Sequence, residues 1–460
     1  MKAGFGKEDI TPDLKKPTPN AAGVDRELKF ILDHIWTRAL VFKDKNNIVV
    51  LVAADVPGFL EKDREDLIQE VEKVCAIKKF ELVFHSVHQH QAPNVSWNSY
   101  GMVNKDGGYA VNEEYYRTFL NKTALAVKQA LKNLEDFSIE YGEAEIKGIE
   151  SNRRIITPEG KIIMRYSRPP KELRKLPEGH IDPLVRVFYL KRKDEKSVVW
   201  VNYHGHPTAT GGDGALFVSA DFPGEALRIL EKEKPENEYI YMTGPNGNLN
   251  PGKYITGDSK KIEDRRNDRD RMGKILAEGV KRALSDCVEI KTGPIKFKRE
   301  KLLLQCKKDD SPEQLWTFYS SYDKAVERYK EALKEMKETH QKGEKLISGG
   351  KIRFAHRIMY YYRIMEDGKI PVYVSVINIG ELNTVFYPGE MFLEASDIIR
   401  EKFPGKRMLT ISLCDGLSNY VVTEDCYEPD RHGYEYSATL LANGSFTAIV
   451  NKSIQMLKEI

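Results

Sequence analysis

The chain has 460 residues, of which 41% are hydrophobic and 31% charged, a balance typical of a globular protein with a substantial core. Its 72 basic and 69 acidic side chains are interspersed and leave a net charge of +3, which argues against a nucleic-acid footprint and a polybasic membrane patch. No apolar run reaches the length of a membrane-spanning helix.

Short β-branched runs alternate with longer amphipathic patterns, which predicts an α/β fold. Strands are expected at Ile48–Ala54, Glu81–Val87, Val198–Tyr203, Val372–Ile379 and Met408–Leu413. Helices are expected at about 61–77, 112–134, 224–233 and 268–285. In the second of these, apolar residues recur at helical spacing behind Asn112, whose side chain can cap the first turn.

A charged helical pattern occurs late in the chain. Residues 311–346 predict one long helix, and a second helical stretch follows at 352–365 after a Ser-Gly-Gly turn. We therefore expect a helical hairpin inserted at 310–366, where it could cap a site or bind a partner. His340 and His356 within it are expected at the surface.

Metal-binding and acid–base side chains follow the predicted strands. They are Asp55, His88, His90, His204, His206, Glu390 and Tyr420. In open α/β sheets, sites form beyond the carboxyl ends of strands. Residues two apart on a strand share a face, so His88 can converge with His90, and His204 with His206, while His85 points the other way.

Imidazole is a good zinc ligand, and a catalytic zinc site keeps one position open for water or substrate. Taken singly, each HxH pair could equally be a solvated strand end or a pair of satisfied core histidines. Two such pairs after two strands favour the metal site.

Several short segments carry a family resemblance, in the same order over most of the chain. They are GFGKEDITP (4–12), LVAADVPG (51–58), SVHQHQAP (86–93), NRR (152–154), HIDP (180–183), YHGHPT (203–208), SADFPGE (219–225), PNGNLNPG (245–252), PGE (388–390) and the segment from NYVVT to EYSAT (419–439). Together they resemble the neutral (non-lysosomal) ceramidases. The resemblance implies a ceramidase-like catalytic domain with a mixed β-sheet core and a metal site at the carboxyl ends of strands.

The resemblance also implies roles for individual residues. The zinc ligands that it implies are His88, His204, Glu390 and Tyr420. It places His90, Arg153 and Tyr434 around the reacting carbon, where they donate to the developing oxyanion. The proton for the leaving nitrogen comes from His90 or His206, because imidazole titrates near neutral pH. Arg153 could instead hold an anionic substrate group.

Two features depart from the family pattern. Asn250 stands where the family has a serine implicated in catalysis and Asn248 where it has an aspartate, and both are expected to bind substrate. The family's additional C-terminal β-sandwich domain has no counterpart, so residues 1–460 are expected to form a single ceramidase-like catalytic domain.

The expected activity is zinc-dependent hydrolysis of a linear amide (N-acyl) bond by a metal-activated water. The segments 97–109 and 210–217 are polar and glycine-rich, which favours a substrate smaller and more polar than ceramide. Two alternatives stay open. One is a metal-dependent enzyme acting on an ester or a sugar-derived substrate, including non-hydrolytic chemistry, and the other is a non-catalytic binding protein that retains the fold.

The expected partner is a small-molecule substrate, with no nucleic acid and no stable membrane insertion, and homo-oligomer formation is left open. The five cysteines are odd in number and show no CxxC spacing, which favours a reducing compartment. The first residues, MKAGFGKEDITPD, lack the apolar segment of a signal peptide. A cytoplasmic location is expected.

Overall fold

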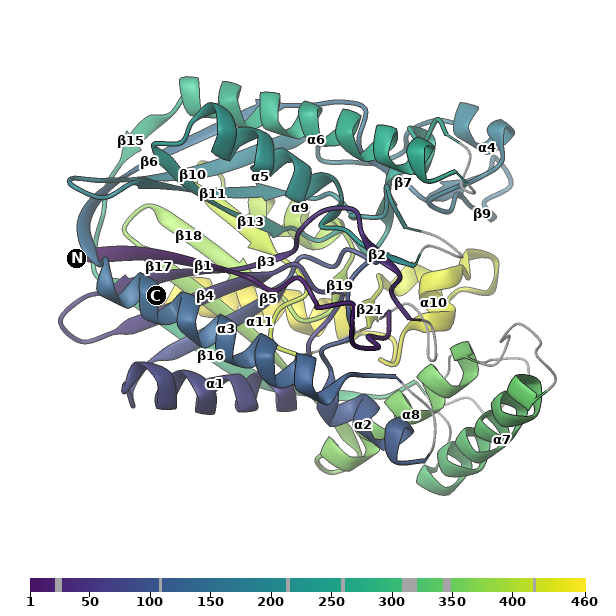
Figure 1. Ribbon diagram of the computed structural model, residues 1–460. Coiled ribbons are helices and arrows are strands. Elements are labelled where there is room, and N and C mark those ends of the chain that lie inside the picture. The colour runs from purple at the N-terminus through teal and green to yellow at the C-terminus, as the bar shows by residue number, and fades with distance from the viewer. Residues whose placement is uncertain are drawn as a thin grey trace.

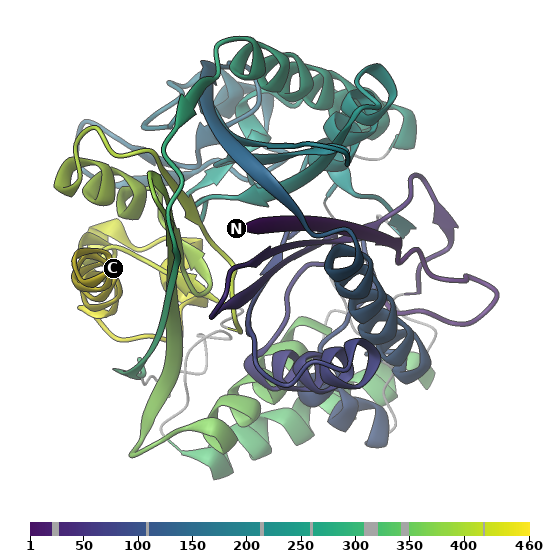
Figure 2. The same cartoon turned by 90° about the vertical axis from the view of Figure 1, so that its left-hand side faces the viewer.

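Two β-sheets pack face to face between layers of helices (Figures 1 and 2). The computed structural model describes residues 1–20, 27–106, 110–211, 216–257, 261–307, 321–341, 349–416 and 419–460. The predicted α/β class is confirmed.

The larger sheet has nine strands and is mixed. Its order is β13, β11, β10, β6, β1, β3, β4 and β5, with β15 also paired to β6. The β4–β5 and β11–β13 pairs are parallel and the others antiparallel. The strands are β1 (Lys2–Asp9), β3 (Trp36–Lys43), β4 (Ile48–Ala54), β5 (Glu81–Ser86), β6 (Glu135–Glu145), β10 (Leu184–Arg192), β11 (Ser197–Tyr203), β13 (Asn237–Thr243) and β15 (Val288–Ile290).

The smaller sheet has four strands in the order β16, β17, β18 and β20, and only its β18–β20 pair is parallel. Its strands are β16 (Ile295–Gln305), β17 (Lys369–Ile379), β18 (Leu382–Phe386) and β20 (Met408–Ile411). Four further pairs are short: β2 (Phe30–Ile31) with β12 (Phe217–Val218), β7 (Ser151–Asn152) with β14 (Leu249–Asn250), β8 (Arg154–Ile156) with β9 (Ile162–Met164), and β19 (Glu390–Met391) with β21 (Tyr420–Val421).

Helices cover the outer faces of both sheets. On the larger sheet, α1 and α3 lie over β1 and β3–β5, and α5 and α6 lie over β6, β10, β11 and β13. On the smaller sheet lie α9 and α11. The helices are α1 (Glu61–Cys75), α2 (Trp97–Lys105), α3 (Glu113–Lys132), α4 (Lys171–Lys175), α5 (Asp221–Glu233), α6 (Ile262–Ser285), α7 (Tyr322–Gln341), α8 (Gly349–Ile364), α9 (Glu394–Lys402), α10 (Tyr434–Ala438) and α11 (Ser445–Glu459), with 3-10 turns at Pro251–Lys253, Glu424–Tyr427 and Pro429–Arg431.

The two sheets bury apolar side chains between them. Trp200 of β11 stacks on Phe386 of β18 with ring centroids 6.3 Å apart, and both are almost fully buried. On the opposite face of the larger sheet, α3 lies so close to β1 that a Cβ on Gly6 would fall 2.1 Å from the Ala126 carbonyl oxygen. Glycine in β1 therefore permits the close approach of α3 to this face of the larger sheet.

The carboxyl ends of strands from both sheets are tied together at one end of the molecule. The Ser412 amide donates to the Thr243 carbonyl (3.0 Å), and the Ser86 amide donates to the Leu413 carbonyl (3.1 Å). Leu413 has a φ of +57°, which extended backbone does not adopt, so β20 stops two residues before the predicted end. The residues that follow β5, β13 and β20 are therefore held next to one another.

Most predicted elements are found, with shifted ends. The α3 cap is as expected, because Asn112 accepts a hydrogen bond from the Tyr115 amide (3.1 Å). Helix α5 begins at Asp221 and α6 at Ile262, both earlier than predicted. Helices α7 and α8 occupy the predicted hairpin, and residues 308–320 and 342–348 lie outside the described residues. The prediction for His356 was wrong: α8 packs into the core and this side chain is fully buried.

None of the helices in the described ranges is long and apolar enough to cross a membrane. The division of the chain into one catalytic domain with an insertion at 310–366 stays a prediction.

Candidate metal centre

Three histidine side chains meet beyond the ends of β5 and β11. One ligand nitrogen from each of His88, His90 and His206 lies within 4.8 Å of the other two, a spacing that could hold a metal ion. The Nε2 atoms of His90 and His206 are 3.4 Å apart, and the ring of His88 lies 5.0 and 5.1 Å from the rings of His90 and His206. His88 and His206 are buried and His90 is partly exposed.

His88 is oriented by the turn after β4. Its Nδ1 donates to the Pro57 carbonyl, and its amide donates to the Val56 carbonyl (3.0 Å). Because a carbonyl can only accept, Nδ1 of His88 carries a proton, and Nε2 is the ring atom left to face the other histidines and bind a metal. His88 has a φ of +74°, a strained conformation for this residue type that the two hydrogen bonds hold in place.

His206 lies three residues after the end of β11, directly after Gly205. Its Nδ1 donates to the Asn246 carbonyl (3.4 Å), which leaves Nε2 facing His90. Burial, reinforced by the charges of His88 and Arg153, lowers the pKa of His206 well below its ordinary value. The ring is therefore neutral at physiological pH, the form in which imidazole binds metals.

Glu390 and Tyr420 come from the parallel pair of β19 and β21, in which they are direct partners. Glu390 Oε2 is buried, lies 3.3 Å from His88 Nε2, and has no hydrogen-bond donor within bonding geometry among the described residues. Burial would raise the pKa of Glu390, but the proximity of the His88 imidazole, followed by that of His206 and the Tyr420 side chain, holds it below its ordinary value. An ionised carboxylate with a bare oxygen beside imidazole nitrogens is what a metal site requires.

Arg153 and Tyr434 lie beside this group. The Arg153 guanidinium is centred 5.1 Å from the Tyr420 ring and 5.6 Å from the Tyr434 ring. Its Nε donates to Glu435 Oε1 (2.5 Å) and its Nη2 to the Gly247 carbonyl (2.5 Å). Glu435 is fully buried and also accepts from Arg154 Nη1 (2.9 Å). Nothing in the sequence distinguishes Glu435 from its acidic neighbours, because its partners lie about 280 residues away.

His204 lies outside the histidine group. Its Nδ1 donates to the Pro245 carbonyl (3.0 Å), and its Nε2 faces Asp182 Oδ2 at 3.3 Å. Asp182 also accepts from Arg186 (2.7 Å) and lies 3.0 Å from Arg400. The structure therefore brings His206 to His88 and His90, and places His204 in a buried ion cluster with Asp182, Arg186 and Arg400. β11 ends at Tyr203, so the strand alternation that grouped His204 with His206 does not continue through these two residues.

The side chains of Asn248 and Asn250 also make hydrogen bonds within the protein. The Asn248 amide nitrogen donates to Glu394 (2.9 Å) and its side-chain oxygen accepts from the Leu393 amide (3.0 Å). Asn250 donates to the Arg165 carbonyl (2.7 Å) and accepts from the Gly252 amide (2.9 Å). Both residues are almost fully buried, and substrate binding by this pair stays a prediction.

Two neighbouring residues have structural roles as well. His85 donates from Nδ1 to the Ser412 carbonyl (2.8 Å) and accepts the Thr243 amide (3.1 Å) at Nε2. Burial lowers its pKa to about 3. Asp55 accepts the Trp36 amide (2.8 Å) and contacts Arg38.

Known proteins share part of this sequence and the whole of this fold. Residues 1–257, more than half of the chain, match the model of the N-terminal region of neutral/alkaline non-lysosomal ceramidases. The chain belongs to the neutral/alkaline ceramidase family. A neutral ceramidase from Pseudomonas aeruginosa has the same fold, with a TM-score of 0.71 at 15% identity over all of this chain and 74% of that one. A ceramidase complexed with C2 has a TM-score of 0.73 at 15% identity over all of this chain and 75% of that one. None of the curated proteins compared with the chain matches it.

The predicted ceramidase-like fold is thus confirmed. The family match covers the histidine group and Arg153, whereas Glu390, Tyr420 and Tyr434 lie outside the matched residues. In this ceramidase-family chain, Glu390, Tyr420 and Tyr434 lie on β19, β21 and α10. These elements come late in the sequence, and folding of the chain brings them to the centre (Figure 1).

Proposed function

We propose that this chain is a zinc-dependent hydrolase of linear amide (N-acyl) bonds, with the metal held by His88, His206, Glu390 and Tyr420. The observation that supports it is the grouping of His88, His90 and His206, with a buried carboxylate oxygen of Glu390 lying 3.3 Å from His88 Nε2. Nitrogen ligands with one carboxylate suit zinc better than calcium or magnesium, which prefer oxygen. A zinc ion bound there supplies a Lewis acid and a water of lowered pKa.

The surrounding residues have roles that follow from their contacts. Arg153 is held by Glu435 and Gly247 beside the rings of Tyr420 and Tyr434, where it and Tyr434 stabilise negative charge developing on the carbonyl oxygen. Because His206 is assigned to the metal, His90 is the imidazole left to deliver a proton to the departing nitrogen. Its partial exposure gives this proton a path to solvent.

The proposed substrate is an N-acyl compound smaller and more polar than ceramide. The support is the polar character of the segments 97–109 and 210–217, of which residues 107–109 and 212–215 lie outside the described residues. In the described part, the Gly211 Cα lies close enough to His90 that a Cβ there would meet the His90 Cβ at 3.6 Å. Gly211 therefore lies next to one of the histidines of the centre.

The test is an activity panel on zinc-loaded protein and on the same protein after chelation. The panel runs from ceramide through short N-acyl amines to N-acyl sugars and the matching esters. We expect turnover of short N-acyl amines that is lost with the metal and restored by zinc. Hydrolysis of the esters alone, or activity that survives complete removal of metal, would contradict the proposal. Ceramide turned over as fast as the best short substrate would contradict the proposed substrate size.

A further inference from the structure

One exposed aromatic ring lies on a fixed piece of main chain beside the centre. It belongs to Tyr166, which is 54% exposed and follows the pair of β8 and β9. The preceding residue, Arg165, donates its amide to the Arg153 carbonyl (2.8 Å) and accepts from the Asn250 side chain (2.7 Å). The Tyr166 carbonyl packs so closely on Gly252 that a Cβ there would fall 2.2 Å away. The main chain of Tyr166 is therefore held directly next to a residue that is hydrogen-bonded to Arg153.

The residues that follow this tyrosine bind the segment that comes after His206. Ser167 Oγ donates to Thr208 Oγ1 (2.9 Å), and Arg168 Nε donates to the Gly211 carbonyl (3.2 Å). The segment that carries the exposed ring is thus fixed from a second side. A ring held in this way loses little conformational freedom when a ligand covers it.

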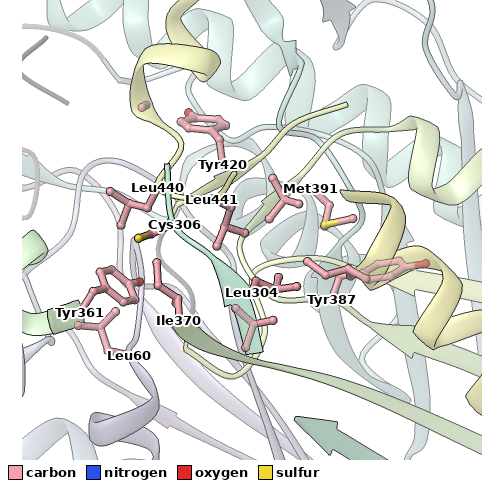
Figure 3. Packing of buried hydrophobic residues seen from close by; sticks show 14 of the residues in the cluster. Leu60, Leu304, Cys306, Tyr361, Ile370, Tyr387, Met391, Tyr420, Leu440 and Leu441 are labelled. Carbon is pink, nitrogen blue, oxygen red and sulfur yellow. The ribbon is translucent and has the colours of Figure 1, made fainter. Parts of the chain in front are cut away.

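Three tyrosine rings form a continuous series from the buried centre to the surface. The Tyr420 ring is buried in a hydrophobic cluster with Met391 and Leu440 (Figure 3). The Tyr434 ring lies 5.6 Å from it, and the Tyr166 ring lies 6.3 Å from that of Tyr434, both in edge-to-face geometry. Tyr434 is half-buried. A group that covers the Tyr166 ring therefore extends a packed set of rings that begins at the centre.

The exposed side chains of β8 and β9 are both apolar. Ile156 of β8 is 58% exposed, and Ile163 of β9 is 39% exposed. Figure 1 shows β9 at the same end of the molecule as α10, which carries Tyr434. Exposed hydrocarbon on the strands that lead to an exposed ring favours an apolar ligand group.

The rings favour an aromatic group over a linear chain. An aromatic ring packed on tyrosine gains an edge-to-face or offset-stacked interaction beyond the area that it buries, which an alkyl chain does not. A linear chain also loses rotational freedom about each bond that it fixes, whereas a phenyl ring is rigid.

The position of the Tyr166 ring assigns it to the acyl side of the scissile bond. Under the proposed function Arg153 and Tyr434 stabilise charge on the carbonyl oxygen, and His90 delivers a proton to the departing nitrogen. The Tyr166 ring contacts the ring of Tyr434. The substrate group nearest to Tyr166 is therefore the one attached to the carbonyl carbon.

We propose that Tyr166 determines specificity by binding an aromatic acyl group, so that the preferred substrates are N-arylacyl amines such as N-phenylacetyl compounds. This assignment rests on the proposed amide hydrolysis. The phenyl ring packs on the exposed face of Tyr166, with the apolar side chains of β8 and β9 beside it. The amine of the substrate lies on the side of His90.

The test compares N-phenylacetylethanolamine with N-octanoylethanolamine, whose acyl groups contain the same number of carbon atoms. Wild-type protein should show a kcat/KM about 3- to 10-fold higher for the phenylacetyl compound, the range that an aromatic pair contributes. Tyr166→Leu should remove this preference, whereas Tyr166→Phe, which retains the ring, should keep it. The matched control is Tyr322→Leu, because Tyr322 of α7 is also exposed (38%) and lies edge-to-face with Tyr362 at 6.0 Å. This control should change neither value.

A binding measurement separates this assignment from the proposed function. Calorimetry of zinc-loaded protein with the corresponding ketones, in which a methylene group replaces the amide nitrogen, reports binding without hydrolysis. Tyr166→Leu should bind the phenyl ketone about 3- to 10-fold more weakly than the wild type, and the alkyl ketone with less than about a twofold change. If the wild type hydrolyses neither amide, the proposed function fails, while this binding difference still decides the role of Tyr166.

Several outcomes would overturn the role of Tyr166. They are equal losses for both compounds, a Tyr166→Leu variant with the wild-type preference, and a wild type that prefers the octanoyl compound. A wild-type dimer that dissociates in Tyr166→Leu, or binding to phosphatidylcholine vesicles that this variant loses, would assign the ring to a protein interface or a lipid surface instead. If Tyr166→Leu does not fold, Tyr166→Val should show the same loss of preference.

Discussion

Replacing His206 with alanine is expected to remove the metal and at least about 10³-fold of the activity, whereas replacing His204 with alanine should leave the metal in place. His206 Nε2 lies among the imidazoles of the centre, and His204 Nε2 faces Asp182. Loss of a ligand removes Lewis-acid stabilisation that contributes several kcal/mol to the transition state. The two histidines are two residues apart after the same strand, so each variant controls for the other.

The measurement is metal content by mass spectrometry after dialysis, combined with kcat/KM for a short N-acyl amine. Thermal melting of both variants checks that the fold is intact. His204→Ala should remain close to one zinc per chain, because Arg186 and Arg400 still neutralise Asp182. Retention of zinc by His206→Ala together with its loss from His204→Ala would reverse the assignment and favour the ligand set expected from the resemblance alone.

The second large effect is expected at Arg153. Arg153→Met should lower kcat by about 10²- to 10³-fold, the range for removal of one oxyanion donor, without changing zinc content. Arg154→Met is the matched control, because Arg154 binds the same Glu435 but its other contact is the Arg431 carbonyl. In both variants Glu435 keeps one arginine partner, so neither leaves a buried carboxylate alone.

A comparison of kcat and KM in these two variants distinguishes a catalytic role from a structural one. A fall in kcat confined to Arg153→Met supports stabilisation of the transition state. Equal falls in both variants, accompanied by equal losses of melting temperature, would mean that the Arg–Glu–Arg cluster only supports the fold.

The sequence was most informative where chemistry follows directly from local pattern. The β4 strand at Ile48–Ala54 was predicted to the residue, and the strand-end rule picked out His88 and Glu390, which the structure places 3.3 Å apart. These two predictions depend only on a local pattern: the run of apolar residues that forms a strand, and the position of the residues just after it.

The choice between His204 and His206 could not be made from sequence. Both follow β11, and their rings are directed by the carbonyls of Pro245 and Asn246, which lie 41 and 40 residues further along the chain. The packing of α8 against α2 and the strands of the centre was not predicted either, because an amphipathic pattern gives no sign of which elements a helix packs against. Contacts of this range depend on the assembled fold.

Diffraction data collected on both sides of the zinc absorption edge, from crystals of the zinc-loaded protein, would locate the metal. We expect one strong anomalous peak within about 2.0–2.2 Å of the Nε2 atoms of His88 and His206 and of a Glu390 oxygen. A peak between His204 and Asp182, or no peak in protein that retains amide hydrolysis, would contradict the proposed centre.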